Sequence, residues 1–103
     1  MNDINYFSSI VKILENPSKS FFINNLLTTK LRAQLPQSRN TKMVNLIFWG
    51  SLASDIATYY KANDYILIEG YLALPKTVNS RRLEITVLKV YPFVIDYNKE
   101  VID

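Results

Sequence analysis

The residues from Phe48 to Leu74 read as a strand, a short helix, a turn and a second strand in close succession. The first strand ends on an aromatic pair, and Gly50 breaks it. Apolar residues then recur at helical spacing from Ser51, a suitable N-cap, to about Tyr60. Alternating apolar and polar residues predict the second strand over Tyr65–Leu74. A helix this short between two strands indicates a small β domain in which the helix covers one end.

The sequence predicts four strands in addition to Tyr65–Leu74. Apolar alternation together with β-branched and aromatic residues predicts them at Tyr6–Leu14, Phe21–Leu31, Met43–Trp49 and Leu83–Tyr91. With Tyr65–Leu74 the chain has five strands, and its helix lies between the third and the fourth. This is the layout of an all-β, five-stranded Greek-key barrel, whose binding face lies near strands two and three.

Side-chain alternation divides each strand into an inner and an outer set, because successive side chains point to opposite faces. In Met43–Trp49 the unbroken apolar set of Val44, Leu46 and Phe48 is the better core face, which leaves Trp49 on the outside. For Phe21–Leu31 we expect an inner set of Ile23, Leu27 and Leu31 and an outer set of Phe22, Lys30 and Arg32.

The composition is that of an ordinary globular domain, and it excludes much chemistry. With 103 residues, half of them apolar and a fifth charged, we expect one domain over residues 1–103, with a core at about 5–92 and a short tail at 93–103. The chain has no Cys and no His, which removes disulfides, thiolate or imidazole metal sites and the common nucleophile pairs. We therefore expect no catalytic residues, no metal, no cofactor and no small-molecule substrate. No apolar run reaches membrane-spanning length.

Basic residues gather in two groups, although the net charge is only +3. No acidic residue lies between Glu15 and Asp55, and the cations inside that window include Lys30, Arg32, Arg39 and Lys42. A second group lies between the last two predicted strands and consists of Lys76, Arg81 and Arg82. This uneven distribution favours a polyanionic partner more than the net charge does.

The central stretch resembles the bacterial-type single-stranded-DNA-binding proteins, which are oligonucleotide-binding (OB) folds. The resemblance is carried by Trp49-Gly50-Ser51-Leu52-Ala53, by Tyr59 or Tyr60, by Lys61-Ala62-Asn63-Asp64 and by Ile68-Glu69-Gly70-Tyr71-Leu72. Asn63 stands where the family usually has Gly, and we expect it to take the left-handed conformation of a helix C-cap. Glu69 we expect to be structural, paired with a neighbouring Arg or Lys.

The resemblance implies that Trp49 stacks on a base, and it implies a partner of single-stranded DNA, with DNA versus RNA left open. We predict phosphate contacts from the loop before strand three for Lys30, Arg32, Arg39 and Lys42, and from the hairpin on the other side for Lys76, Arg81 and Arg82. Tyr71 should face outward and stack or donate a hydrogen bond. Assembly through exposed barrel strands would give a homodimer or homotetramer.

With its Gln34-Leu35-Pro36-Gln37 loop, the chain resembles the short, tail-less members of that family encoded in algal plastid genomes and in cyanobacteria. This implies a place in the plastid stroma or the cyanobacterial cytoplasm, in DNA replication, repair, recombination or related nucleic-acid metabolism. Two alternatives stay open. Trp49 could be ordinary packing over the helix or barrel end, and the fold could serve as a protein-interaction or assembly module that has lost nucleic-acid binding, with Trp49, Ile47 and Met43 as the interface.

Overall fold

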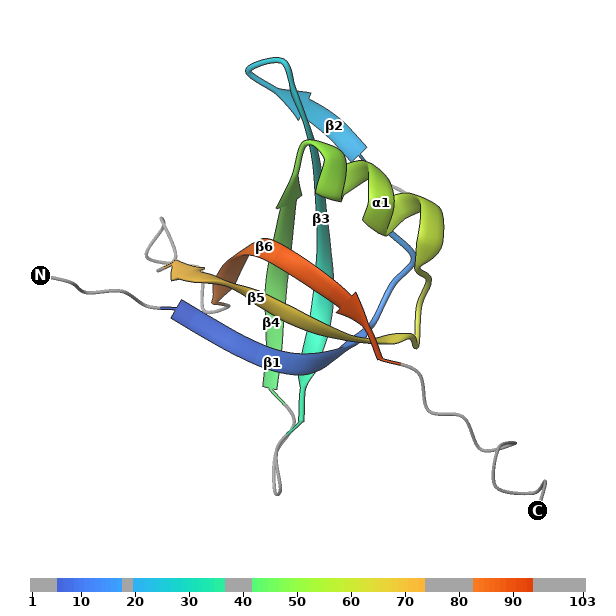
Figure 1. Ribbon diagram of the computed structural model, residues 1–103, viewed down its shortest axis with the longest axis vertical. Helices are drawn as coiled ribbons and strands as arrows, with labels where there is room; N and C mark the ends of the chain where they lie inside the picture. Colours follow the sequence, from blue (N-terminus) through green and yellow to red (C-terminus); the bar gives the residue numbers. More distant parts are fainter. Residues whose placement is uncertain (1–5, 18–19, 37–41, 74–82, 94–103) are drawn as a thin grey trace, which may run out of the picture.

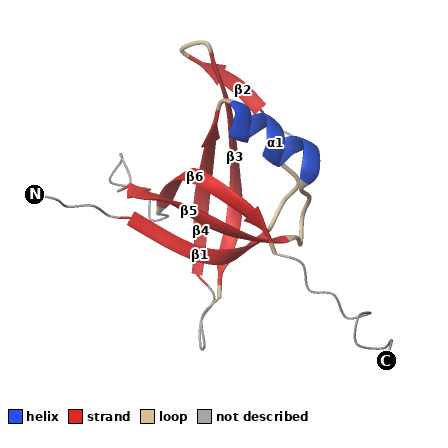
Figure 2. Ribbon diagram, in the orientation of Figure 1, coloured by secondary structure: helices blue, strands red, loops and turns tan. Residues whose placement is uncertain are grey.

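The computed structural model describes residues 6–17, 20–36, 42–73 and 83–93, which form six strands and one helix (Figures 1 and 2). In chain order the elements are β1 (Tyr6–Ile13), β2 (Ser20–Ile23), β3 (Leu26–Leu35), β4 (Lys42–Trp49), α1 (Ser51–Tyr59), β5 (Tyr65–Ala73) and β6 (Glu84–Pro92). No helix in these ranges is long and apolar enough to span a membrane.

Five of the strands close into a barrel. The sheet order is β1-β5-β6-β4-β3, and β1 also pairs with β3 through Lys12 and Ile13, which joins the two ends. All barrel pairs are antiparallel except β4 with β6. The helix lies between the third and fourth barrel strands, β4 and β5, and covers the upper right of the barrel in Figure 1. The predicted all-β fold, a five-stranded barrel with one helix at this place, is confirmed.

The second predicted strand is in fact a hairpin. The expected strand Phe21–Leu31 turns back at Asn24 and Asn25, so that β2 pairs with the start of β3 and projects from the top of the barrel (Figure 1). Both asparagines have positive φ, 52° and 67°, as the two-residue type I′ turn between antiparallel strands requires. Asn tolerates this conformation better than other residues with a Cβ.

This turn changes part of the predicted inner set. Leu31 is buried and Leu27 is half-buried against the core as expected, whereas the turn places Ile23 opposite Leu26 on the outer side of the hairpin. Lys30 and Arg32 are exposed on the outer side as predicted, whereas Phe22 lies opposite Leu27 and is exposed on the other side of the hairpin. Every predicted core residue of β4 is fully buried, as are Ile66, Ile68 and Ile85 in the later strands.

Both ends of the helix differ from their predicted form. The N-cap is Gly50, with φ 64° and ψ −131°, so Ser51 is the first helical residue and makes no cap hydrogen bond. A left-handed residue at this corner favours glycine because it has no Cβ. Asn63 does have positive φ, 77°, but the helix C-cap is Tyr60. Asn63 lies instead in the following turn, where its N–H donates to the carbonyl of Ile13 over 2.7 Å.

Gly70 lets β5 and β6 approach closely where their register shifts. The shift lies between Glu69 and Gly70, which face Lys89 and Val87 respectively. A Cβ on Gly70 would collide with the carbonyl oxygen of Thr86 and lie 2.9 Å from its carbon. Because that neighbour is backbone rather than a flexible side chain, only glycine fits at this position. The bulge that it permits is the kind of local bend that barrel closure uses.

Candidate nucleic-acid interface

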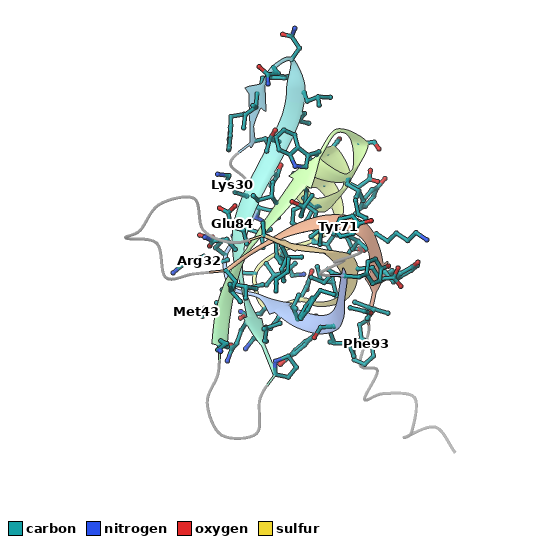
Figure 3. The ribbon with its side chains drawn as sticks, turned by 90° about the vertical axis from the view of Figure 1, so that its left-hand side faces the viewer. Lys30, Arg32, Met43, Tyr71, Glu84 and Phe93 are labelled. Atoms are coloured by element: carbon teal, nitrogen blue, oxygen red, sulfur yellow. The ribbon has the colours of Figure 1, made fainter. Side chains whose placement is uncertain are left out.

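The outer side chains of β3 and β4 form one continuous face. The two strands pair over eight residues each, so outer residues lie directly opposite one another in the pairs Thr28–Trp49, Lys30–Ile47, Arg32–Asn45 and Gln34–Met43. We call this set the outer face of β3–β4. Figure 3 shows Lys30, Arg32 and Met43 on the same side of the molecule. From Thr28 to Gln34 the face spans seven residues, or about 20 Å along β3.

Trp49 lies at the upper end of this face and is half-buried. Its register partner Thr28 is fully buried, although it points outward, and Thr28 also pairs with Phe21 of β2. An outward threonine is buried only when its neighbours cover it, and its two neighbours in this row are the aromatic residues Phe21 and Trp49. The ring of Trp49 therefore packs in part against its own strand face and keeps part of its surface open.

The hairpin adds apolar surface beside Trp49. On its outer side lie Phe21, Ile23 and Leu26, which we call the hairpin patch, and Phe21 and Leu26 are 40% and 51% exposed. These residues were not among the predicted site residues, because residues 21–31 were expected to form one strand. The signal was present: two adjacent asparagines between apolar residues are typical of a two-residue hairpin turn.

Three of the predicted cations lie within strands rather than in the loop where they were expected. Lys30 and Arg32 are within β3 itself, not in the loop before β4, because β3 extends to Leu35. Both are exposed on the outer face of β3–β4. Lys42 is exposed at the first residue of β4. Arg39, Lys76, Arg81 and Arg82 lie outside the described residues.

Carboxylates moderate the positive charge of this face. The Arg32 side chain is 3.4 Å from Oε2 of Glu15, which also accepts a 2.7 Å hydrogen bond from the Arg32 backbone N–H. Glu84 pairs with Asn45, the register partner of Arg32, and lies between Lys30 and Arg32 in Figure 3. Neither Glu15 nor Glu84 lies inside the stretch without acidic residues between positions 15 and 55. That stretch therefore gave no indication that two carboxylates come close to this face.

Tyr71 faces outward as predicted, but it belongs to a different cluster. It is separated from Lys30 by β6 and β4, in the row Tyr71–Thr86–Ile47–Lys30, or about 14 Å. Its ring instead meets that of Tyr6 edge to face, with centroids 5.8 Å apart. Figure 3 shows it apart from the β3 cations. The structure therefore does not bring Tyr71 together with Trp49.

Glu69 has a tyrosine partner rather than the basic partner that we expected. Tyr6 donates its phenolic hydrogen to Oε1 of Glu69 over 2.6 Å. This hydrogen bond, together with desolvation and the negative charge of Glu69, raises the pKa of Tyr6 from 10.0 to about 12. The bond holds the Tyr6 ring against Tyr71, so Glu69 has a structural role, as predicted, through a different contact.

The chain is similar to a named relative and to solved bacterial structures. No protein-family model matches the chain. The chain is 38% identical over 104 residues to the protein named "Putative single-stranded DNA-binding protein ycf41" of Trieres chinensis, covering 90% of this chain and 92% of that one.

Solved structures of three bacterial proteins share the fold, each with a TM-score of 0.74. They are the SSB domain of a Synechococcus protein (20% identity, 88% of this chain and 98% of that one), the second single-stranded-DNA-binding protein of Mycobacterium smegmatis (22%, 87% and 89%) and the small single-stranded-DNA-binding protein of Streptomyces coelicolor (12%, 96% and 98%).

The Tyr6–Glu69 bond predicts an alkaline titration. Tyr6 in the folded protein should ionise at about pH 12, and Glu69→Gln should lower that pKa towards 10. A raised folded-state pKa stabilises the fold fully below about pH 10, and this stabilisation is lost as the pH rises through 12. NMR titration of ring-labelled tyrosine measures it, with Tyr6→Phe assigning the signal. A wild-type Tyr6 that ionises near pH 10 would show that the hydrogen bond does not persist in solution.

Proposed function

Because this chain belongs to the bacterial-type family of single-stranded-DNA-binding proteins, in the branch of the ycf41 protein, we propose that it binds single-stranded DNA without catalysing a reaction. The observation that carries the proposal is the outer face of β3–β4, where a partly open tryptophan and two exposed cations lie in line. Proteins that bind single strands combine these two features, a stacking aromatic and a positive track along the backbone.

In this mechanism Trp49 stacks on one base, and the hairpin patch covers its neighbour with apolar surface. Lys30 and Arg32, which follow along β3, neutralise successive phosphates, and Lys42 contacts the strand at the first residue of β4. We extend the same role to Arg39, Lys76, Arg81 and Arg82, and we assign Tyr71 a peripheral contact. None of these contacts reads a base edge, so binding is expected to be tolerant of sequence.

The Arg32–Glu15 ion pair lowers the positive charge of this face but does not prevent Arg32 from contacting a phosphate. Both side chains are nearly half exposed, 45% and 41%, and exposed ion pairs contribute little net free energy, typically below about 1 kcal/mol. A phosphate can therefore replace Glu15 at Arg32 at small cost. We place this activity in plastid nucleic-acid metabolism, in replication, repair or recombination, because the ycf41 relative links the branch to plastids.

We also propose that the protein forms a homodimer or homotetramer through β1. Residues Tyr6–Lys12 pair with β5, but only Lys12 and Ile13 pair with β3, so within the described strands the second edge of Tyr6–Val11 is unpaired. An open edge offers free N–H and C=O groups to another strand, and a second copy of β1 is the self-complementary solution.

Sedimentation velocity across a concentration series tests the assembly. The expected result is the mass of two or four copies, with a lower mass only on dilution. A single-copy mass at every concentration would contradict the use of the β1 edge and would leave the nucleic-acid proposal intact, because the outer face of β3–β4 is contained within one copy.

Trp49 is the only tryptophan, which makes it an assignable probe of DNA binding. Titration with a thymidine homopolymer should quench its fluorescence, less so at higher salt, and Trp49→Ala should weaken binding by about 1–3 kcal/mol. Trp49→Phe should keep most of the affinity and the packing over Thr28. Tyr59→Ala, at a 73% exposed position on α1, is the matched control and should bind as wild type. No quenching at low salt, together with no complex on a gel, would refute the proposal and favour the protein-interface alternative.

Salt dependence tests the cations one at a time. If three to five phosphates are neutralised, log affinity should fall with log salt at a slope of about −2 to −3.5, at about −0.7 per contact. Lys30→Gln should make the slope shallower by about 0.7. Glu15→Gln should strengthen binding, because it frees Arg32 while a Gln oxygen can still accept from the Arg32 N–H.

The control for these variants is Lys89→Gln, at an exposed residue of β6 opposite Glu69. It should leave both affinity and slope unchanged. If Glu15→Gln also changes neither quantity while Lys30→Gln weakens binding, Glu15 does not compete with the DNA for Arg32.

A further inference from the structure

A pocket lies on the outside of the barrel at the seam where β1 meets β3. Its volume is about 180 Å³, and it is lined by Ile10, Lys12, Gln34, Pro36 and Tyr65. We call it the seam pocket. Its walls come from β1, from the end of β3 and from the first residue of β5, three segments that lie far apart in the sequence. No residue of the pocket belongs to the set of contacts assigned above.

Strand register connects this pocket with the outer face of β3–β4. The last outer pair of that face is Gln34–Met43, and Gln34 pairs on its other side with Lys12, which in turn pairs with Tyr65. The row Met43–Gln34–Lys12–Tyr65 thus continues around the barrel in steps of about 4.8 Å. A DNA strand that follows β3 past Lys30 and Arg32 meets the seam pocket as its next site.

The lining has the chemistry that one nucleotide requires. Tyr65 is 40% exposed and offers an aromatic face, while Ile10 and Pro36 add apolar walls. The Lys12 ammonium lies 6.0 Å from the centre of the Tyr65 ring, at the outer limit of a cation–π contact, so it is weakly held. No carboxylate of the described residues lies within 4.0 Å of the Lys12 ammonium, whose charge suits a phosphate.

Size restricts what can occupy the site. Pockets for drug-sized ligands and cofactors span about 300–1,000 Å³, and this one is smaller. It suits a single planar ring with an anionic group outside it. Gln34 supplies an amide that can both donate and accept a hydrogen bond at the edge of such a ring.

We propose that the seam pocket holds one nucleotide at the end of the bound single strand. The base stacks on Tyr65 between the apolar walls, and Lys12 turns from the ring to the adjoining phosphate. This inference rests on the proposed function, and it adds a site at the end of the outer face of β3–β4, with which it shares Gln34. It predicts that a strand too short to reach the seam gains nothing from Tyr65 or Lys12.

Thymidine oligonucleotides of about 4 to about 16 residues, the range of site sizes for one OB fold, test this with an end label read by fluorescence anisotropy. Tyr65→Leu removes the aromatic face and keeps apolar bulk, so it should lower the affinity for the longer oligonucleotides about fivefold or more and leave the shortest unchanged. Tyr65→Phe should bind every length as wild type. Lys12→Gln should make the salt slope on the longer oligonucleotides shallower by about 0.7.

Tyr59→Leu and Lys89→Gln are the matched controls, an exposed tyrosine and an exposed lysine elsewhere on the molecule, and both should bind as wild type. If Tyr65→Leu binds all lengths as tightly as wild type, the seam pocket is refuted while the proposed function stands. An equal loss at every length, including the shortest, would also refute a site at the end of the path. If the wild-type protein binds no length at all, the proposed function fails and the seam pocket fails with it.

Discussion

The packing of the barrel interior decides which side chains are offered to a ligand. Val44, Leu46 and Phe48 are completely buried in β4, and Leu31 and Ala33 are buried in β3. Because strands alternate at a period of two, this inner set forces Lys30, Arg32 and Ile47 onto the other face. A slip of one residue would bury the cations and expose the core. The candidate interface is therefore held in place by the apolar residues on the opposite side of the same strands.

The face that results is less basic and more apolar than a simple cationic groove. Glu15 meets Arg32, and Glu84 lies across β4 from Arg32, so the local charge is smaller than the number of lysines and arginines suggests. The hairpin patch beside Trp49 adds exposed apolar surface to this weakly charged face. Such a balance favours stacking over long-range attraction, and it fits a binder with moderate salt dependence.

Prediction from the sequence succeeded where the local residue pattern and the tertiary structure favour the same conformation. The barrel, the helix between β4 and β5 and the outward position of Trp49 followed from alternation and from the motif around Gly50 and Gly70. It failed at the hairpin turn, since Asn24 and Asn25 divide what was expected to be one strand. Asn63 took the expected left-handed conformation in a different turn, because any site that needs positive φ selects the same residue.

The sequence by itself determined the inner and outer sets of the strands and the absence of Cys and His chemistry, because side-chain alternation and residue type are local properties. Only the tertiary structure decided which distant residues meet. Tyr6 and Glu69 are 63 residues apart, Arg32 lies 17 residues from Glu15, and the seam pocket needs β1, β3 and β5 together. These contacts depend on the register of non-neighbouring strands, which is set when the barrel closes and leaves no periodic signal in the chain.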